Sequence, residues 1–237
     1  MYFFEVFGYL FVVLASIGSM IAASLVNSTF RKYSAQISSM GITGAEAARR
    51  VMEQNGVFGV RVERVSGNLT DHYDPRDNTV YLSDSVYDSK STAAIGVASH
   101  EAGHAVQHAK NYVPVRIRTA IVPIANIGTK LSVPMILIGL LLSGVAAFPY
   151  GYPIAMAGVL FFGLSVVFQL VTLPTELDAS HRAMSAIREG NLLVGEELVG
   201  ARKTLTAAAM TYVAALAYTL LQFLRLLALV SGGRRRR

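Results

Sequence analysis

Four long hydrophobic runs dominate the pattern of apolar and polar positions along this 237-residue chain. They cover residues 6–26, 133–148 with an extension back to about 120, 152–173 and 205–230. A helix that crosses a bilayer needs about 20 mostly apolar residues. The first, third and fourth runs meet this length as they stand, and the second meets it in its extended form. The pattern therefore predicts an α-helical polytopic membrane protein with about four spans.

A polar stretch, residues 27–118, lies between the first two runs and shows helical signals of its own. Thr43 and Glu46 form a capping box, in which each side chain can cap the other's backbone amide. A short helix is therefore expected over residues 47–54. A serine just before residue 92 can cap a second helix, which the pattern places over about 92–110.

The polar stretch also carries strand signals ahead of its second helix. Residues 58–65 alternate like a strand, and residues 69–83 read as two short strands around the turn DPRDN. The stretch is thus expected to form a small α+β region. The chain divides into a first anchor (1–26), the α+β region (27–118), the second and third transmembrane helices (119–173), a helix and loop (174–204), and the fourth transmembrane helix with a basic tail (205–237).

Composition supports a membrane protein. Hydrophobic residues make up 53% of the chain and charged residues only 15%, against about 25% charged in soluble domains. The net charge is +6, but many Lys and Arg flank the apolar runs and form no nucleic-acid-binding motif. The expected partner is therefore the lipid bilayer and not nucleic acid. The chain has no cysteine, which excludes disulfides, thiol nucleophiles and cysteine metal ligands.

Basic residues also predict an orientation. Residues 27–118 contain eleven Lys and Arg, whereas the tip PYGY between the second and third runs contains none. The positive-inside rule then places the polar stretch in the cytoplasm, in a multi-pass protein of the cell membrane. Four spans would leave the tail 234–237 outside, against the same rule, so the side of the tail stays open.

The sequence His100-Glu101-Ala102-Gly103-His104 is an H-E-x-x-H motif on a predicted helix. Residues four apart share a helix face, so the two imidazoles can bind one tetrahedral Zn2+. Glu101 can take a proton from the attacking water and pass it to the leaving amine. The alternative is a surface helix with incidental histidines. His108 lies about 12 Å of helix rise from His100, too far to share the metal comfortably.

A third ligand must come from elsewhere in the chain. Candidates are His72, His181 and several carboxylates, of which Glu176 is favoured because it follows the third run directly, on the expected side of the motif. Pro174 suits the first turn of a separate helix there. If Glu176 is not a metal ligand, it could be a first-turn carboxylate that interacts favourably with the helix dipole. Weaker candidates lie in what reads as an acidic loop: Glu189, Glu196 and Glu197.

Three stretches resemble the YugP-type neutral zinc metallopeptidases of bacterial membranes: LTDHYDPR (69–76), AAIGVASHEAGHAVQHA (93–109) and PTELDASHRA (174–183). The resemblance implies a zincin-like, gluzincin-type site beside the membrane, with Glu101 as base and three zinc ligands, His100, His104 and Glu176. Many gluzincins carry Asp four residues after the ligand Glu. This chain has Ser180 there, and Asp178 could take its place.

Two further residues are candidates for stabilising the oxyanion, because a donor or positive group acts as negative charge develops. They are His72, which could instead merely flank a turn, and Arg182, which could pair with Asp178 four residues away. The function these features predict is a zinc-dependent membrane endopeptidase acting on protein or peptide substrates.

Two other classes of function were weighed against the peptidase. One is a catalytically inactive, peptidase-like membrane scaffold or adaptor, against which the intact Glu101 argues. The other is a transporter, whose spans should carry polar or broken segments; Lys130 and Pro134 hint at this only weakly. The sequence leaves the oligomeric state open.

Overall fold

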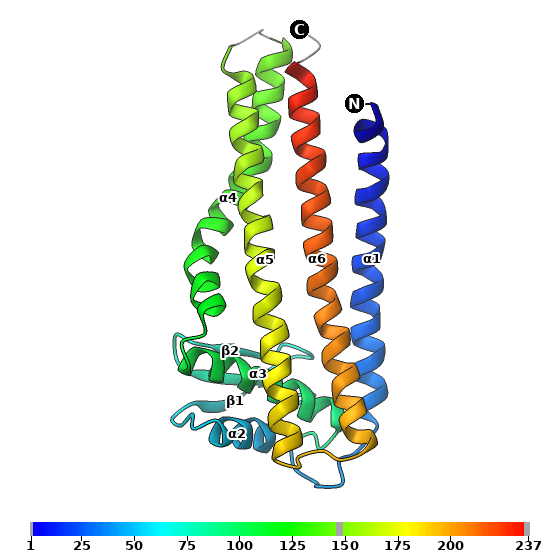
Figure 1. The fold of residues 1–237 in the computed structure, drawn as a ribbon, viewed down its shortest axis with the longest axis vertical. Helices are drawn as coiled ribbons and strands as arrows, with labels where there is room; N and C mark the ends of the chain where they lie inside the picture. The colour runs from blue at the N-terminus through cyan, green and yellow to red at the C-terminus, as the bar shows by residue number, and fades with distance from the viewer. Residues whose placement is uncertain (1, 146–148, 235–237) are drawn as a thin grey trace. The chain divides into compact units, whose positions relative to one another are not determined.

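The computed structural model describes residues 2–145 and 149–234 (Figure 1). The chain forms two compact units. The helical unit comprises Met1–Ile21, Ile117–Leu173 and Tyr212–Arg237, and the α+β unit comprises Ala22–Arg116 and Pro174–Thr211. Both units are thus assembled from segments that are far apart in the sequence.

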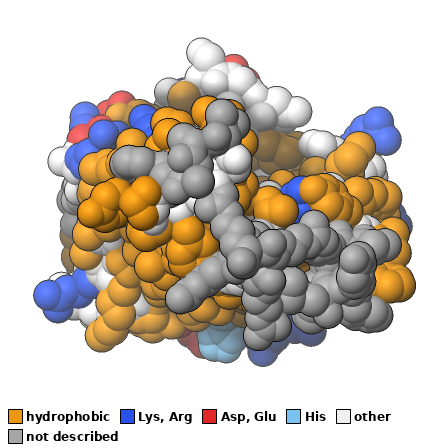
Figure 2. Space-filling view, turned by 90° about the horizontal axis from the view of Figure 1, so that it is seen from above, with side chains coloured by type: hydrophobic (Ala, Val, Ile, Leu, Met, Phe, Trp, Pro, Cys, Tyr) orange, Lys and Arg blue, Asp and Glu red, His pale blue; other side chains and the backbone are white. Residues whose placement is uncertain are grey.

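Four long helices supply the helical unit and continue along the chain into the α+β unit. They are α1 (Tyr2–Ser34), α4 (Val113–Val145), α5 (Gly151–Glu189) and α6 (Glu196–Arg234). Each is long and apolar enough to cross a membrane. Large hydrophobic side chains lie exposed along them, and such side chains cover much of the described surface seen in Figure 2. The predicted polytopic helical fold is confirmed.

Close backbone contact joins α4 to α5 within the helical unit. A Cβ atom added at Gly139 would collide with the backbone of Ala155, and one added at Gly158 would lie 2.8 Å from the Ser132 carbonyl oxygen. Small residues let membrane helices approach in this way. On α6, the Arg225 guanidinium carbon lies 3.8 Å from the centre of the Tyr9 ring of α1, so α1 and α6 are in contact there.

Two expectations about helix ends prove wrong. Pro174 was expected to begin a separate helix, but it lies inside α5, which runs unbroken from Gly151 to Glu189. Proline removes one backbone hydrogen bond but keeps a helical φ, and the residues on both sides favour helix. Glu189, Glu196 and Glu197 were expected in a loop. Glu189 is instead the last residue of α5, and Glu196 and Glu197 lie in the first turn of α6, where carboxylates interact favourably with the helix dipole.

The α+β unit contains a three-stranded sheet and two shorter helices, as the sequence predicted. The strands β1 (Arg61–Val65), β2 (His72–Asp74) and β3 (Thr79–Ser83) lie in the order β1-β3-β2. β1 is parallel and β2 antiparallel to the central β3. β2 is therefore an edge strand of the sheet.

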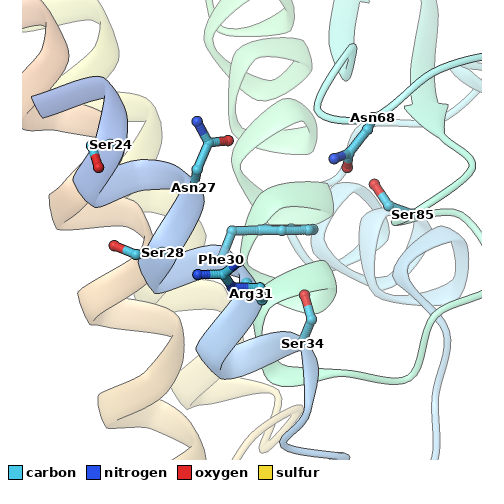
Figure 3. Close-up of a pocket in the computed structure, with 8 residues that line it drawn as sticks. All are labelled: Ser24, Asn27, Ser28, Phe30, Arg31, Ser34, Asn68 and Ser85. Carbon is cyan, nitrogen blue, oxygen red and sulfur yellow. The ribbon is translucent and has the colours of Figure 1, made fainter. Parts of the chain in front are cut away.

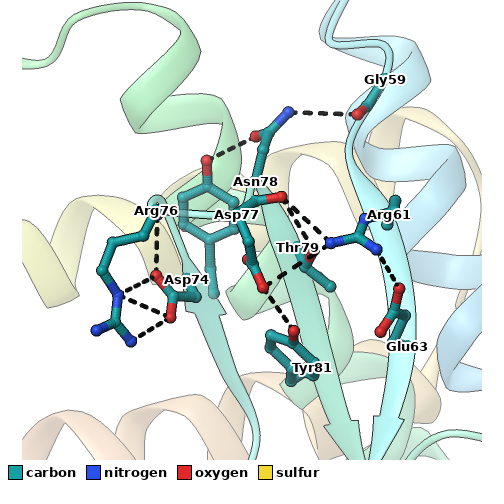
Figure 4. Close-up of polar contacts among 10 residues, drawn as sticks. Gly59, Arg61, Glu63, Asp74, Arg76, Asp77, Asn78, Thr79 and Tyr81 are labelled. Carbon is teal, nitrogen blue, oxygen red and sulfur yellow. Dashed lines mark hydrogen bonds and ion pairs between the residues drawn. The ribbon is translucent and has the colours of Figure 1, made fainter.

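The turn between β2 and β3 is held by side-chain hydrogen bonds (Figure 4). The Tyr73 hydroxyl donates to the Asn78 side-chain oxygen at 2.9 Å, and the Tyr81 hydroxyl donates to the Asp77 carboxylate at 2.6 Å. Hydrogen bonds from Arg76 lower the pKa of Asp74 to about 2. Asn78 takes the left-handed conformation, φ 55°, which asparagine tolerates in turns. These contacts explain why the predicted DPRDN turn forms.

The two helices are α2 (Gly44–Gln54) and α3 (Thr92–Ala109). α3 begins where the sequence predicted, whereas α2 begins directly after Thr43, three residues earlier than expected. The capping box is present at the start of α2, and the Ser91 hydroxyl accepts the Ala94 amide at the start of α3. Both helices share one apolar core with the sheet, which includes Val80 and Leu82 of the central strand. This packing fixes α3, the helix that carries the H-E-x-x-H motif.

Candidate metal centre

The histidines of the motif lie on a helix whose other side is fully buried. Ala98, Ala102 and Ala105 of α3 are at most 1% exposed and belong to the apolar core. His100 and His104 lie one turn apart, and their side chains are each 13% exposed. The small alanines fix the rotation of the helix, so that both imidazoles project from the same side.

Glu176 of α5 lies against both imidazoles. Its side chain is 3% exposed, and its Oε2 atom is 3.2 Å from His100 Nε2 and 3.4 Å from His104 Nε2. The three residues form a group of side chains that could hold a metal ion. The structure thus brings together the three residues that sequence and resemblance named as ligands.

The close approach of α3 and α5 depends on Gly103. A Cβ atom at this position would lie 2.7 Å from the carbonyl oxygen of Ala179 in α5. That is shorter than real Cβ contacts, so a larger residue would push the two helices apart. Glycine inside the motif therefore lets Glu176 reach the two histidines.

The donor atoms fit a tetrahedral metal ion. Zinc bonds nitrogen and oxygen ligands at about 2.0–2.1 Å, so two ligand atoms of a regular tetrahedron lie about 3.3–3.4 Å apart. The two Nε2 to Oε2 distances, 3.2 and 3.4 Å, agree with this spacing. Two imidazoles and one carboxylate, completed by water as a fourth ligand, are the donor set of a catalytic zinc site.

The other nitrogen of each imidazole contacts a polar group. His100 Nδ1 lies 3.1 Å from the Ser180 hydroxyl, and His104 Nδ1 lies 3.0 Å from the Gln107 side-chain oxygen. Such contacts orient metal-binding histidines and leave Nε2 for the ion. Ser180 stands where many gluzincins have Asp, and here its hydroxyl contacts the first histidine.

Charges around the site shift two pKa values in the protein without metal. Burial alone would lower the pKa of His104, but the Glu176 hydrogen bond and the charges of Glu101 and Glu176 outweigh burial and raise it. Burial raises the pKa of Asp71, hydrogen bonds from Ser83 oppose this increase, and the charge of Glu101 adds to it. Glu101 is thus close enough to interact electrostatically with both residues.

The two candidates for the oxyanion role have other contacts. The His72 ring stacks on Tyr81 at 5.0 Å between ring centres, with Nδ1 2.9 Å from the Thr70 carbonyl oxygen. Arg182 donates to Asp178 at 2.6 Å, the pairing considered from the sequence. Neither residue belongs to the group of His100, His104 and Glu176.

The remaining histidine and carboxylate candidates also lie outside that group. The His108 ring contacts the Tyr73 ring at 5.3 Å between centres, and His181 is exposed. Glu189 and Glu196 are exposed as well, and Glu197 accepts the Ser39 amide at 2.7 Å.

Sequence reasoning missed Gln107 and Asp71. Gln107 lies three residues after His104, a spacing that puts two side chains on one helix face, and that spacing could have identified it. Asp71 lies in the stretch LTDHYDPR, one of those used for the resemblance, but its position beside Glu101 depends on the packing of the sheet against α3.

A separate pocket of about 510 Å³ lies in the α+β unit (Figure 3). None of the three candidate ligands lines it. Its lining residues, most of which have polar side chains, come from the last part of α1 and from two loop residues, Asn68 and Ser85. The Ser85 hydroxyl lies 3.1 Å from that of Ser83, which in turn hydrogen-bonds Asp71.

Comparison with known proteins agrees with this geometry. Residues 8–231 match the model of a family described as "Putative neutral zinc metallopeptidase", and the chain belongs to that family. It is also 41% identical, over 227 residues, to the "Putative membrane protease YugP" of Bacillus subtilis (strain 168). This alignment covers 95% of the chain and 98% of the relative. No solved structure matches the chain significantly. The resemblance identified from the three motifs is confirmed.

Proposed function

We propose that this protein is a zinc-dependent membrane endopeptidase whose metal ligands are His100, His104 and Glu176. The observation that carries the proposal is the convergence of two Nε2 atoms on one Oε2 atom at 3.2 and 3.4 Å. Membership of a zinc metallopeptidase family supports the choice of metal and reaction. The four candidate spans support a multi-pass membrane location.

Different residues of the protein have different roles in the proposed hydrolysis. A bound zinc ion supplies Lewis acidity, which acidifies water and polarises a peptide carbonyl. Glu101 follows the first ligand on α3 and takes the proton of the attacking water, then passes it to the leaving amine. Ser180 and Gln107 hold the two imidazoles in place. His72 and Arg182 stay candidates for stabilising the oxyanion: His72 stacks on Tyr81, and Arg182 donates to Asp178.

The edge strand β2 supports a peptide as substrate. Its outer side has no partner strand among the residues that the structure describes, and an extended peptide can add to such an edge through backbone hydrogen bonds. Asp71, directly before β2, interacts electrostatically with Glu101, so the start of this strand lies near the proposed base. An inactive scaffold would need neither Glu101 nor a free edge.

The test separates the base from the ligands. Glu101→Gln should keep zinc but reduce peptidase activity on an unfolded protein substrate by about 10²- to 10⁴-fold, the usual contribution of an acid or base. Glu176→Ala should lose both zinc and activity, because it removes one of three ligands. Zinc content and turnover are measured on the same purified, detergent-solubilised preparations.

Glu189→Gln is the matched control, since Glu189 is an exposed carboxylate on the same helix as Glu176. It should keep zinc and full activity. Undiminished turnover of Glu101→Gln would remove Glu101 as the base. Tight zinc binding by Glu176→Ala would remove the proposed ligand set, and zinc binding without turnover in the wild type would favour the scaffold.

A further inference from the structure

Gln107 of α3 is a polar side chain with no exposure to solvent, 0%. Its amide makes three hydrogen-bond contacts. Nε2 donates to the Thr175 carbonyl oxygen at 2.8 Å and to the Asp178 carboxylate at 2.7 Å, and Oε1 lies 3.0 Å from His104 Nδ1. All of these partners belong to α3 or to the stretch of α5 around Glu176.

These partners fix which way the amide points. A carbonyl oxygen and a carboxylate can only accept hydrogen bonds, so the NH2 group of Gln107 must face Thr175 and Asp178. A flipped amide would turn its oxygen towards two other acceptors. Asp178 is itself held, because Arg182 donates to the same carboxylate oxygen at 2.6 Å. The oxygen of Gln107 is therefore held against His104.

The orientation of this amide has a consequence for His104. An oxygen that can only accept requires a donor opposite it, so Nδ1 of His104 must carry a proton. Nε2, which faces Glu176, is then the nitrogen that a metal ion can bind. His100 is different, because its partner is the Ser180 hydroxyl, which can donate or accept. Only the second histidine of the motif thus has its tautomer fixed by its partner.

We propose that Gln107 is a positioning residue that locks His104 in the metal-binding tautomer, with Asp178 and the Thr175 carbonyl oxygen locking Gln107 in turn. The inference rests on the proposed function in one respect, that His104 binds zinc. It adds a link from α5 back to α3: the helix that supplies Glu176 also supplies the two acceptors that orient the amide beside His104.

The first experiment removes the acceptor and keeps the shape. Gln107→Met in the full-length protein should lower zinc affinity by about 10- to 100-fold, the usual effect of losing a partner of a metal-binding histidine. Affinity is measured by competition with a chelator. Gln54→Met is the matched control, since Gln54 is exposed on α2, and it should bind zinc like the wild type.

A second readout separates orientation from packing. With Co2+ in place of zinc, the Nδ1 proton of a bound histidine gives a shifted NMR signal that survives only when exchange with water is slow. The wild type should show this signal for His104, and Gln107→Met should lose it. A persistent signal with unchanged affinity would overturn the inference.

A rescue variant covers the case in which Gln107→Met fails to fold. Gln107→Glu keeps an oxygen opposite His104 Nδ1, and as the neutral acid its hydroxyl can still donate to the Asp178 carboxylate. Its zinc affinity should lie closer to the wild-type value than that of Gln107→Met, whereas an affinity as weak as that of Gln107→Met would overturn the inference. Absence of zinc binding in the wild type would overturn the proposed function as well, while equal binding by wild type and Gln107→Met would overturn this inference alone.

Discussion

The carboxyl group of Asp71 is partly buried and lies within the electrostatic influence of another acid, Glu101. Ser83 satisfies it with a backbone amide at 2.7 Å and with its hydroxyl, yet burial and the charge of Glu101 still raise its pKa. A group whose pKa is higher in the folded than in the unfolded protein binds its proton more tightly when folded. Ionised Asp71 therefore opposes folding, chiefly because it is partly buried and to a lesser extent because of the charge of the proposed base, Glu101.

This predicts a pH-dependent effect of Asp71→Asn. The pKa of an aspartate in the unfolded chain is about 4, and that of folded Asp71 is higher. As pH rises through this interval, ionisation of Asp71 lowers the stability of the wild type. Asp71→Asn has no carboxyl group at this position and is not destabilised in this way. The melting temperature of Asp71→Asn relative to wild type should therefore be higher at pH 7 than at pH 4. Thermal unfolding in detergent at both pH values measures this difference, and the opposite trend would contradict the assigned cause.

Individual residues differ in how far the sequence could identify them. His100, Glu101 and His104 follow from a motif whose spacing is fixed by one helix, and Glu176 was favoured because it follows an apolar run. The roles of Gln107 and Ser180 depend on where α5 lies against α3. That position is tertiary information: the spacing from His104 could have marked Gln107 as a neighbour of the histidine, but no local pattern shows its contacts with α5 or the contact of Ser180 with His100.

At the scale of elements, α5 is the clearest departure from expectation. Its apolar first part and its ligand-bearing second part form one helix through Pro174. Proline is common in the first turn of a helix and is tolerated inside long membrane helices. Pro174 alone therefore could not show whether a new helix begins there or the apolar helix continues. The strands and the capped helices α2 and α3 were predicted well, because their turn and capping residues act locally.

Two glycines of α3 give a matched test of helix spacing. A Cβ at Gly103 would lie 2.7 Å from the Ala179 carbonyl oxygen, whereas one at Gly96 would lie 3.5 Å from Ala201, an ordinary contact. Gly103→Ala should therefore weaken zinc binding by displacing α5, and Gly96→Ala should leave it unchanged. Gly96→Ala should also raise stability slightly, since alanine favours a helix interior by about 1 kcal/mol over glycine.

Zinc titration and thermal melting of both variants check this prediction. Equal zinc affinities for the two alanine variants would show that the close approach at Gly103 does not position Glu176. A loss of affinity confined to Gly103→Ala would tie the motif's glycine to the geometry of the site.

For the whole molecule, the chain's lack of cysteine allows a clean test of membrane orientation. We propose, from the distribution of Lys and Arg, that the α+β unit faces the cytoplasm. Tyr150 and Phe58 are 64% and 75% exposed, so a cysteine at either position should be accessible. Tyr150→Cys should react with an impermeant thiol reagent in intact cells, and Phe58→Cys should react only after permeabilisation. The reverse pattern would place the candidate site outside.

The order of the ligands along the chain bears on how the protein is made. His100 and His104 leave the ribosome well before Glu176, and α4 and the apolar part of α5 are synthesised between them. Two spans must therefore be inserted before the chain returns with its third ligand. A nascent chain that has not yet reached Glu176 lacks one of the three proposed ligands, so under the proposed function it cannot cleave its neighbours. Under that proposal, synthesis and membrane insertion of α4 and the apolar part of α5 would precede any peptidase activity of the chain.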